Sequence, residues 1–115
     1  MSDDKHVERR AALRAGYRDL AAAIPTQMKG FGDLHRSSVA DGALSRATKE
    51  LMSLAIGIST RCEDCVTLHL YDALQAGATD EEVHETIGVA LMMGGGPAST
   101  AATGALETLA EYRRA

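Results

Sequence analysis

The stretch RCEDCVTLHLYD, residues 61–72, holds both cysteines of the chain, with two residues between Cys62 and Cys65. His69 follows the second cysteine by four positions. We expect this stretch to open a helix. Because helical residues three or four apart share a face, the three side chains should lie on one side of that helix or in its first turn.

The composition around this stretch favours an all-α fold. Hydrophobic residues make up 45% of the 115 residues, but aromatic residues make up only 3% and Phe31 is the single phenylalanine. The interior must therefore be filled by small and aliphatic side chains, which suits helices packed on helices. We expect one compact domain over residues 1–115, with five to six helices and part of its apolar surface buried between subunits.

Helical periodicity and cap signals divide the chain into elements. They predict helices over about residues 5–24, 46–59 and 62–76, a fourth that ends at the glycine run 94–96, and a fifth from Pro97 onward. Residues 26–41 break the pattern with Gly30 and Gly32, so we expect a connecting loop there with room for a short helix.

Two further signals mark helix ends. Thr79 and Glu82 have the capping-box spacing at the start of the fourth helix, and Gly77 suits the left-handed cap that ends the third. The glycine run 94–96 follows a helix and has no Lys-Ser/Thr pair after it, so we do not assign it a phosphate.

The charge and hydropathy patterns argue against two classes of partner. The formal net charge is -4 and no run of Lys and Arg stands apart from acidic neighbours, which argues against nucleic acid. No apolar run approaches the roughly 20 residues that span a bilayer, and the charged start MSDDKHVERR is unlike a signal peptide. We therefore expect a cytoplasmic protein, in which a cysteine pair serves catalysis or metal binding.

A CxxC pair at the start of a helix suits redox chemistry. The two sulfurs can close a disulfide with little backbone movement, and the free amides of the first turn favour a thiolate. His69, one turn after Cys65, is a candidate base, and Glu50, beside the apolar stripe of the preceding helix, is a candidate to orient it.

The residues by themselves leave three alternatives open. Glu50 can be an ordinary exposed carboxylate, and the cysteines can be small buried hydrophobes. A metal clamp would use Cys62, Cys65, His69 and Glu50, although structural zinc sites usually recruit a second Cys or His pair. We expect the other histidines at the surface or in loops, namely His6, His35 and His84. His35 falls in the connecting loop, where it could border a pocket.

Eleven residues separate Glu50 from Cys62, two separate Cys62 from Cys65, and three separate Cys65 from His69. This spacing closely resembles the core of the AhpD-like alkylhydroperoxidases, within the carboxymuconolactone decarboxylase superfamily. The similarity extends to GALSRATKELMSLAIGIST before the motif, to ALQAGATDEEVHETIGVALMMGGGPA after it and to the alanine-rich last helix, covering about residues 42–110. It implies an all-α fold in which the cysteine helix packs on the Glu50 helix, and assembly into trimers or hexamers.

The resemblance also implies thiol-dependent reduction of peroxides. Cys65 would attack the peroxide and become a sulfenic acid, Cys62 would resolve it as a disulfide, and Glu50 and His69 would relay the proton. A lipoyl protein or a thioredoxin-like reductant would reopen the disulfide, and neither a cofactor nor a metal is implied. The alternative is a member without peroxidase activity that acts as a metal-binding or redox-responsive assembly module.

One position departs from the family pattern. Well-studied members carry a histidine just before the second cysteine, whereas this chain has Asp64, preceded by Glu63. Two carboxylates beside the sulfurs are expected to oppose thiolate formation. We therefore expect His69 and Glu50 to form the whole relay, with consequences for the rate and the peroxide specificity.

Overall fold

The computed structural model describes residues 4–115, and every regular element in that range is an α-helix. The six helices are α1 (Lys5–Ala23), α2 (Pro25–Val39), α3 (Arg46–Ser59), α4 (Glu63–Gln75), α5 (Asp80–Gly94) and α6 (Gly96–Arg114). The prediction of an all-α fold with five to six helices is confirmed. Within the same residues no helix is long and apolar enough to cross a bilayer.

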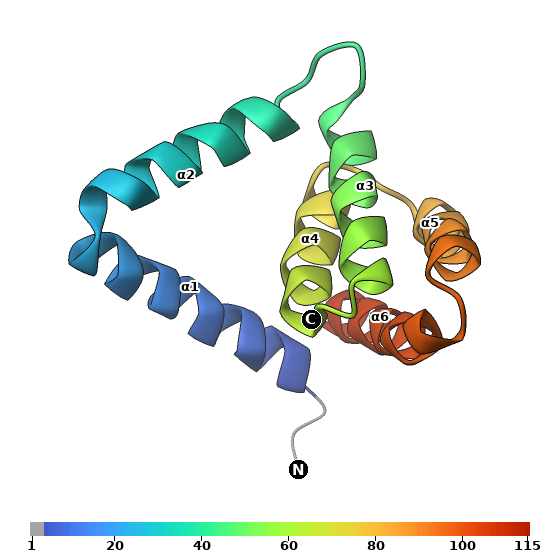
Figure 1. Cartoon of the computed structure of the whole chain (residues 1–115). Coiled ribbons are helices and arrows are strands. Elements are labelled where there is room, and N and C mark those ends of the chain that lie inside the picture. Colours follow the sequence, from blue (N-terminus) through green and yellow to red (C-terminus); the bar gives the residue numbers. More distant parts are fainter. Residues whose placement is uncertain (1–3) are drawn as a thin grey trace.

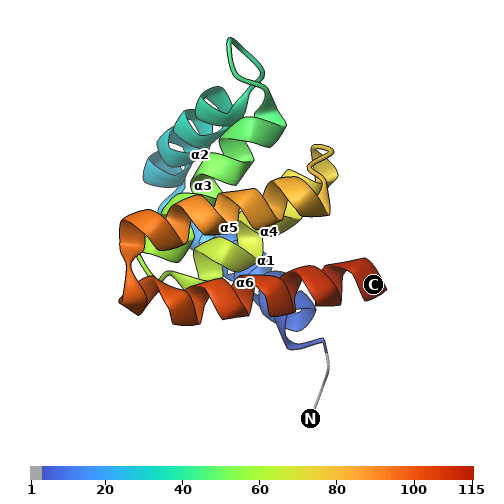
Figure 2. The ribbon, with the colours of Figure 1, turned by 90° about the vertical axis from the view of Figure 1, so that its right-hand side faces the viewer.

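The helices form two parts, a bundle made of α3 to α6 and an arm made of α1 and α2. Helices α3 to α6 pack together, and α1 and α2 make a V whose apex points away from them (Figure 1). After a quarter turn, α5 and α6 lie one above the other across the face of the bundle (Figure 2). The core of the bundle is made of aliphatic side chains and alanines from α3 to α6, among them Leu54, Ile58, Leu70, Val83, Ala90, Ala102, Ala105 and Leu109.

The prediction of a connecting loop over residues 26–41 is wrong, because α2 occupies Pro25–Val39. Pro25 lies in the first turn, where a missing N–H costs nothing. Asp33 pairs with Lys29 at 2.8 Å and with Arg36 at 2.5 Å, and such pairs one turn apart support an isolated helix. These contacts offset part of the cost of about 1 kcal/mol for each helical glycine.

The signals read for the other helix ends are confirmed. The Thr79 and Glu82 side chains form both bonds of the capping box of α5, and Ser45 accepts a hydrogen bond at the start of α3. Gly77, just after α4, has a φ of 101°, the left-handed conformation that glycine adopts without strain. Pro97 lies in the first turn of α6.

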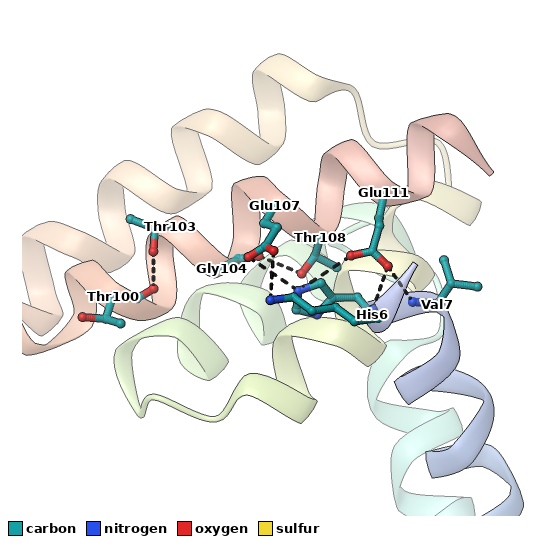
Figure 3. Close-up of polar contacts among 9 residues, drawn as sticks. His6, Val7, Thr100, Thr103, Gly104, Glu107, Thr108 and Glu111 are labelled. Carbon is teal, nitrogen blue, oxygen red and sulfur yellow. Dashed lines mark hydrogen bonds and ion pairs between the residues drawn. The ribbon is translucent and has the colours of Figure 1, made fainter. Parts of the chain in front are cut away.

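The first turn of α1 is attached to α6 through a buried carboxylate. Glu111 is only 1% exposed, and its Oε1 accepts hydrogen bonds from the backbone N–H groups of His6, at 2.7 Å, and Val7, at 3.1 Å (Figure 3). A negative charge at a helix N-terminus is favourable, because it meets both the unpaired amides and the positive end of the helix dipole. Glu111 therefore acts as a cap for α1 that is supplied from another helix.

Large apolar side chains remain exposed on the arm and on one side of the bundle. Helix α1 has no buried residue, so the apolar face expected for it is not covered by its own chain. The exposed apolar side chains include Phe31 and Leu34 on α2, Met52 and Ile56 on α3, and Val89, Met92 and Met93 on α5.

Candidate active site

The two cysteines form a disulfide at the start of α4, with their Cα atoms 5.2 Å apart. Cys62 is the N-cap residue of the helix, and its Sγ accepts a hydrogen bond from the backbone N–H of Cys65 at 3.2 Å. The pair therefore lies in the field of the first-turn amides, which stabilise negative charge on sulfur when the disulfide is open.

The turn between α3 and α4 holds this pair against the end of α3. Arg61 has a φ of 58°, which is uncommon for a residue with a side chain, and the following N–H, of Cys62, bonds to the carbonyl of Gly57 at 2.8 Å. A Cβ added at Gly57 would lie 3.0 Å from the Cβ of Cys65. The absence of a side chain at Gly57 is therefore what lets the cysteine helix approach α3 so closely.

Glu50 and His69 are brought together across the α3–α4 contact. Oε1 of Glu50 lies 2.9 Å from Nδ1 of His69, and Glu50 has no exposed surface. The alternative of an ordinary exposed carboxylate at Glu50 is therefore wrong. With Nδ1 protonated and bonded to the carboxylate, Nε2 of His69 keeps the lone pair of a base.

The second oxygen of Glu50 is in an unusual situation. Oε2 is buried and has no hydrogen-bond partner among the described residues, and Nε of Arg46 lies 3.7 Å from it. The nearby guanidinium lowers the cost of the buried charge, but at this distance it does not donate a hydrogen bond to Oε2.

A shallow pocket of about 210 Å³ lies beside one of the two cysteines, Cys65. Cys65 and His69 both line it, together with Ser53, Ile56, Gly57 and Thr60. Cys62 is not among its lining residues. The four residues singled out in the sequence therefore gather at one place, with Cys65 and His69 on a common pocket, Glu50 behind His69, and Cys62 joined through the disulfide.

A second pocket, of about 280 Å³, lies on the other side of His69, between the arm and α4. It is lined by Tyr17 of α1, by Met28, Phe31, Gly32 and His35 of α2, and by Leu68, His69 and Asp72 of α4. The ring centroid of His35 is 5.9 Å from that of His69. His35 was expected in a loop at the edge of a pocket, and it does border one, but from a helix. The signal for this was the spacing of Met28, Phe31 and His35, which places them on one helical face.

Asp64, the residue that departs from the family pattern, is paired with a cation. Its two carboxylate oxygens accept hydrogen bonds from Nε and Nη2 of Arg9, both at 2.9 Å. The Arg9 guanidinium holds the pKa of the Asp64 carboxyl below its usual value, with partial burial working weakly against it. The expectation that two uncompensated carboxylates oppose the thiolate therefore needs correction, because α1 supplies a charge that offsets one of them.

Asp72, one turn after Leu68 on α4, is close enough to Glu50 and His69 for their charges to act on its carboxyl. Burial raises the pKa of its carboxyl, and the negative charge of Glu50 raises it further, while His69, Arg10 and Arg46 act in the opposite direction.

Comparisons with known proteins agree with this fold and site. The sequence profile described as "Carboxymuconolactone decarboxylase family" matches residues 25–108. The chain belongs to the carboxymuconolactone decarboxylase family, and the resemblance to its AhpD-like members is confirmed at that level.

The similar proteins are of bacterial origin. The apo crystal structure of a carboxymuconolactone decarboxylase family protein from Legionella pneumophila superposes with a TM-score of 0.91 at 34% identity, covering 95% of this chain and 97% of that one. A structure from Thermotoga maritima superposes with a TM-score of 0.83 at 33% identity, covering 96% of this chain and 95% of that one. An uncharacterized protein from Cupriavidus necator is 37% identical over 87 residues, which are 76% of this chain and 77% of the relative.

Proposed function

We propose that this protein is a thiol-dependent peroxidase that reduces alkyl hydroperoxides with the Cys62–Cys65 pair. The observation that carries the proposal is the contact of 2.9 Å between Glu50 and His69, which lies directly behind a pocket that Cys65 shares with His69. A buried carboxylate bonded to Nδ1 orients the ring and leaves Nε2 available as a base, which is the arrangement that activates a nucleophile beside it.

The reaction divides into three balanced steps. The Cys65 thiolate attacks the terminal oxygen of ROOH, the O–O bond breaks, and the products are a sulfenic acid on Cys65 and ROH, which takes the proton. Cys62 then attacks the sulfenic sulfur, its thiol proton goes to the leaving hydroxide, and the disulfide forms with loss of water. Finally an external dithiol reduces the disulfide through a mixed disulfide and becomes oxidised itself.

Each residue of the site has a separate role in this scheme. His69 takes the thiol proton of Cys65 and returns it to the leaving oxygen, and Glu50 stabilises the imidazolium formed in between. Cys65 is the attacking thiol because it lines the pocket with His69, and Cys62 resolves the sulfenic acid from the N-cap position. The structure corresponds to the oxidised end of this cycle.

The partners follow from the chemistry and from the surface. A lipoyl protein or a thioredoxin-like protein is the reductant, because each presents a dithiol that can open a partly exposed disulfide. The apolar side chains left exposed on α1, α2, α3 and α5 support a homo-oligomer. A hexamer or a trimer is proposed from the family resemblance, and a cytoplasmic location from the use of a cysteine pair that must be reduced again in each cycle. A Thermotoga maritima relative has been suggested to take part in an antioxidative response, which agrees with a peroxidase.

A coupled assay tests the proposal. Reduced protein is mixed with tert-butyl hydroperoxide and a dihydrolipoamide regenerating system, and peroxide consumption is followed. The wild type should turn over repeatedly, and Cys65→Ser should consume no peroxide above the uncatalysed background. Peroxide consumption by Cys65→Ser at the wild-type rate would disprove the proposal.

Cys62→Ser is the matched control, because it makes the same atomic change at the other sulfur. Without the external dithiol, which could itself reduce a sulfenic acid, this variant should consume about one equivalent of peroxide per chain and then stop, since the sulfenic acid on Cys65 has no resolving thiol. A dimedone adduct on Cys65 in this variant, detected by mass spectrometry, identifies the attacking residue.

A further inference from the structure

Three metal-ligating side chains converge where the arm meets the bundle. His35 comes from α2, Glu50 from α3 and His69 from α4. One ligand atom of each lies within 4.8 Å of the other two. The rings of His35 and His69 are tilted by 47° to each other, so they are not stacked. Three separate helices thus bring two imidazoles and one carboxylate to a single point.

We propose that His35, Glu50 and His69 form a binding site for a divalent transition metal, with Zn²⁺ as the ion that suits it best. Two histidines and one glutamate are a donor set of zinc sites that keep a fourth position for water or a ligand. Imidazole and carboxylate ligands together favour first-row transition metals over Mg²⁺ and Ca²⁺, which take oxygen ligands.

The unpartnered oxygen of Glu50 is an independent observation in favour of a cation. Oε2 is fully buried and accepts no hydrogen bond among the described residues, with Nε of Arg46 still 3.7 Å away. A buried acceptor without a partner is unfavourable, and more so when it is charged. A metal held by both oxygens of the Glu50 carboxylate would give Oε2 the partner that it lacks.

The distances require only a small rearrangement. A tetrahedral zinc ion holds nitrogen and oxygen ligands at about 2.0–2.2 Å, which separates neighbouring ligand atoms by about 3.3 Å. Oε1 of Glu50 and Nδ1 of His69 are 2.9 Å apart and need to separate by only a few tenths of an ångström. The exposed side chain of His35 closes the remaining distance by rotation about its own bonds. The open fourth position then faces the pocket of about 280 Å³ between the arm and α4.

This site differs from a clamp built on the cysteines. Cys62 and Cys65 are joined in a disulfide, so neither sulfur is a thiolate that could bind a metal. The third ligand beside Glu50 and His69 is therefore His35. Metal binding therefore does not depend on the reduced state. A bound metal also excludes the proton relay of the proposed function, because the metal site and the relay both require Glu50 and His69.

The experiment uses the oxidised full-length protein, stripped of metal and titrated with Zn²⁺ by calorimetry, with elemental analysis of the dialysed product. The wild type should bind one Zn²⁺ per chain. His35→Ala should weaken binding by at least about tenfold, since even loss of an outer-shell partner costs 10–100-fold. His84→Ala, which removes an exposed histidine on α5, is the matched control and should bind as the wild type does.

Two results would overturn the metal site. One is binding of much less than one Zn²⁺ per chain by the oxidised wild type. The other is equal affinity in wild type and His35→Ala, with circular dichroism showing that both are folded. Glu50→Gln should also lose the tight site, which separates it from adventitious binding to surface histidines. The experiment does not measure peroxide consumption, so a failure of the metal site can be told apart from a failure of the proposed function.

Discussion

Arg9, in the second turn of α1, forms two hydrogen bonds of 2.9 Å with Asp64, the residue immediately before Cys65. The arm thus contacts the CxxC segment directly, over 55 positions of sequence. Because Asp64 replaces the histidine of the family pattern, the positive charge that the pair lacks in its own sequence is supplied by another helix. Arg9 and Asp64 are therefore expected to act on the cysteines as a unit.

The first prediction concerns this ion pair. Arg9→Gln leaves the Asp64 carboxylate uncompensated beside Cys65, so the thiolate becomes less favourable and the reduced protein should react more slowly with iodoacetamide at pH 7. The effect should reach about fivefold at most, because ion pairs between exposed side chains are weak. Alkylation followed by mass spectrometry gives the rate for each cysteine.

Two further variants serve as controls for the Arg9 prediction. Arg14→Gln removes an equal charge from an exposed position of the same helix and should leave the alkylation rate unchanged. Asp64→Asn combined with Arg9→Gln should restore the wild-type rate, because the uncompensated charge is gone. Slow alkylation in the double variant would show that Arg9 acts by another route.

Much of this architecture could be predicted from the sequence, because its signals are local. The capping box at Thr79 and Glu82, the proline in the first turn of α6 and the glycine after α4 each mark a helix end within a few residues. The spacing of Cys62, Cys65 and His69 likewise needs only the geometry of one helix.

The features that the sequence did not show depend on tertiary contacts. Helix α2 was missed because its glycines and serines have low helix propensity, while its support comes from side-chain pairs and from docking of its ends. With α2 missed, the approach of His35 to His69 could not be foreseen. The charge of Glu50 favours an exposed position, and only the packing of α3 on α4 buries it.

The second prediction concerns the carboxylate of the relay. Glu50→Gln keeps a side chain of the same shape but cannot stabilise the imidazolium of His69, so kcat/KM for peroxide should fall by about 100-fold or more. The pH profile of kcat/KM should also change, which a purely structural effect would not produce. An unchanged rate of Cys65 oxidation would instead favour a redox-responsive assembly module, since disulfide formation alone needs no relay.

The third prediction concerns the close approach at Gly57. In Gly57→Ala the new methyl group would lie 3.0 Å from Cβ of Cys65 and 3.4 Å from the backbone nitrogen of Val66, so α4 must shift. We expect a loss of about 1–3 kcal/mol in the free energy of unfolding, measured by urea denaturation of the oxidised protein. Gly88→Ala is the control, because nothing lies within 4 Å of its added Cβ, and it should gain up to about 1 kcal/mol.

The fourth prediction concerns the attachment of the arm. Glu111→Ala removes the acceptor of the His6 and Val7 amides, so the first turn of α1 should open more often and the protein should lose about 1–3 kcal/mol of stability. Hydrogen exchange should speed up at these two amides first. Glu85→Ala, which removes an exposed carboxylate from α5, should change their exchange little, and equal effects of both variants would argue against Glu111 as the cap.

The fifth prediction is a dependence of stability on pH that originates at Asp72. Burial and the charge of Glu50 raise the pKa of the Asp72 carboxyl in the folded protein above its value of about 3.9 in the unfolded chain. The stability that protonated Asp72 contributes is therefore present in full below pH 3.9 and is lost as the pH rises through the folded pKa. Asp72→Asn, which stays neutral, should gain stability relative to the wild type between pH 4 and pH 7 in urea denaturation. A difference between the two proteins that stays constant over this range would show that Asp72 is ionised in the folded state as easily as in the unfolded chain.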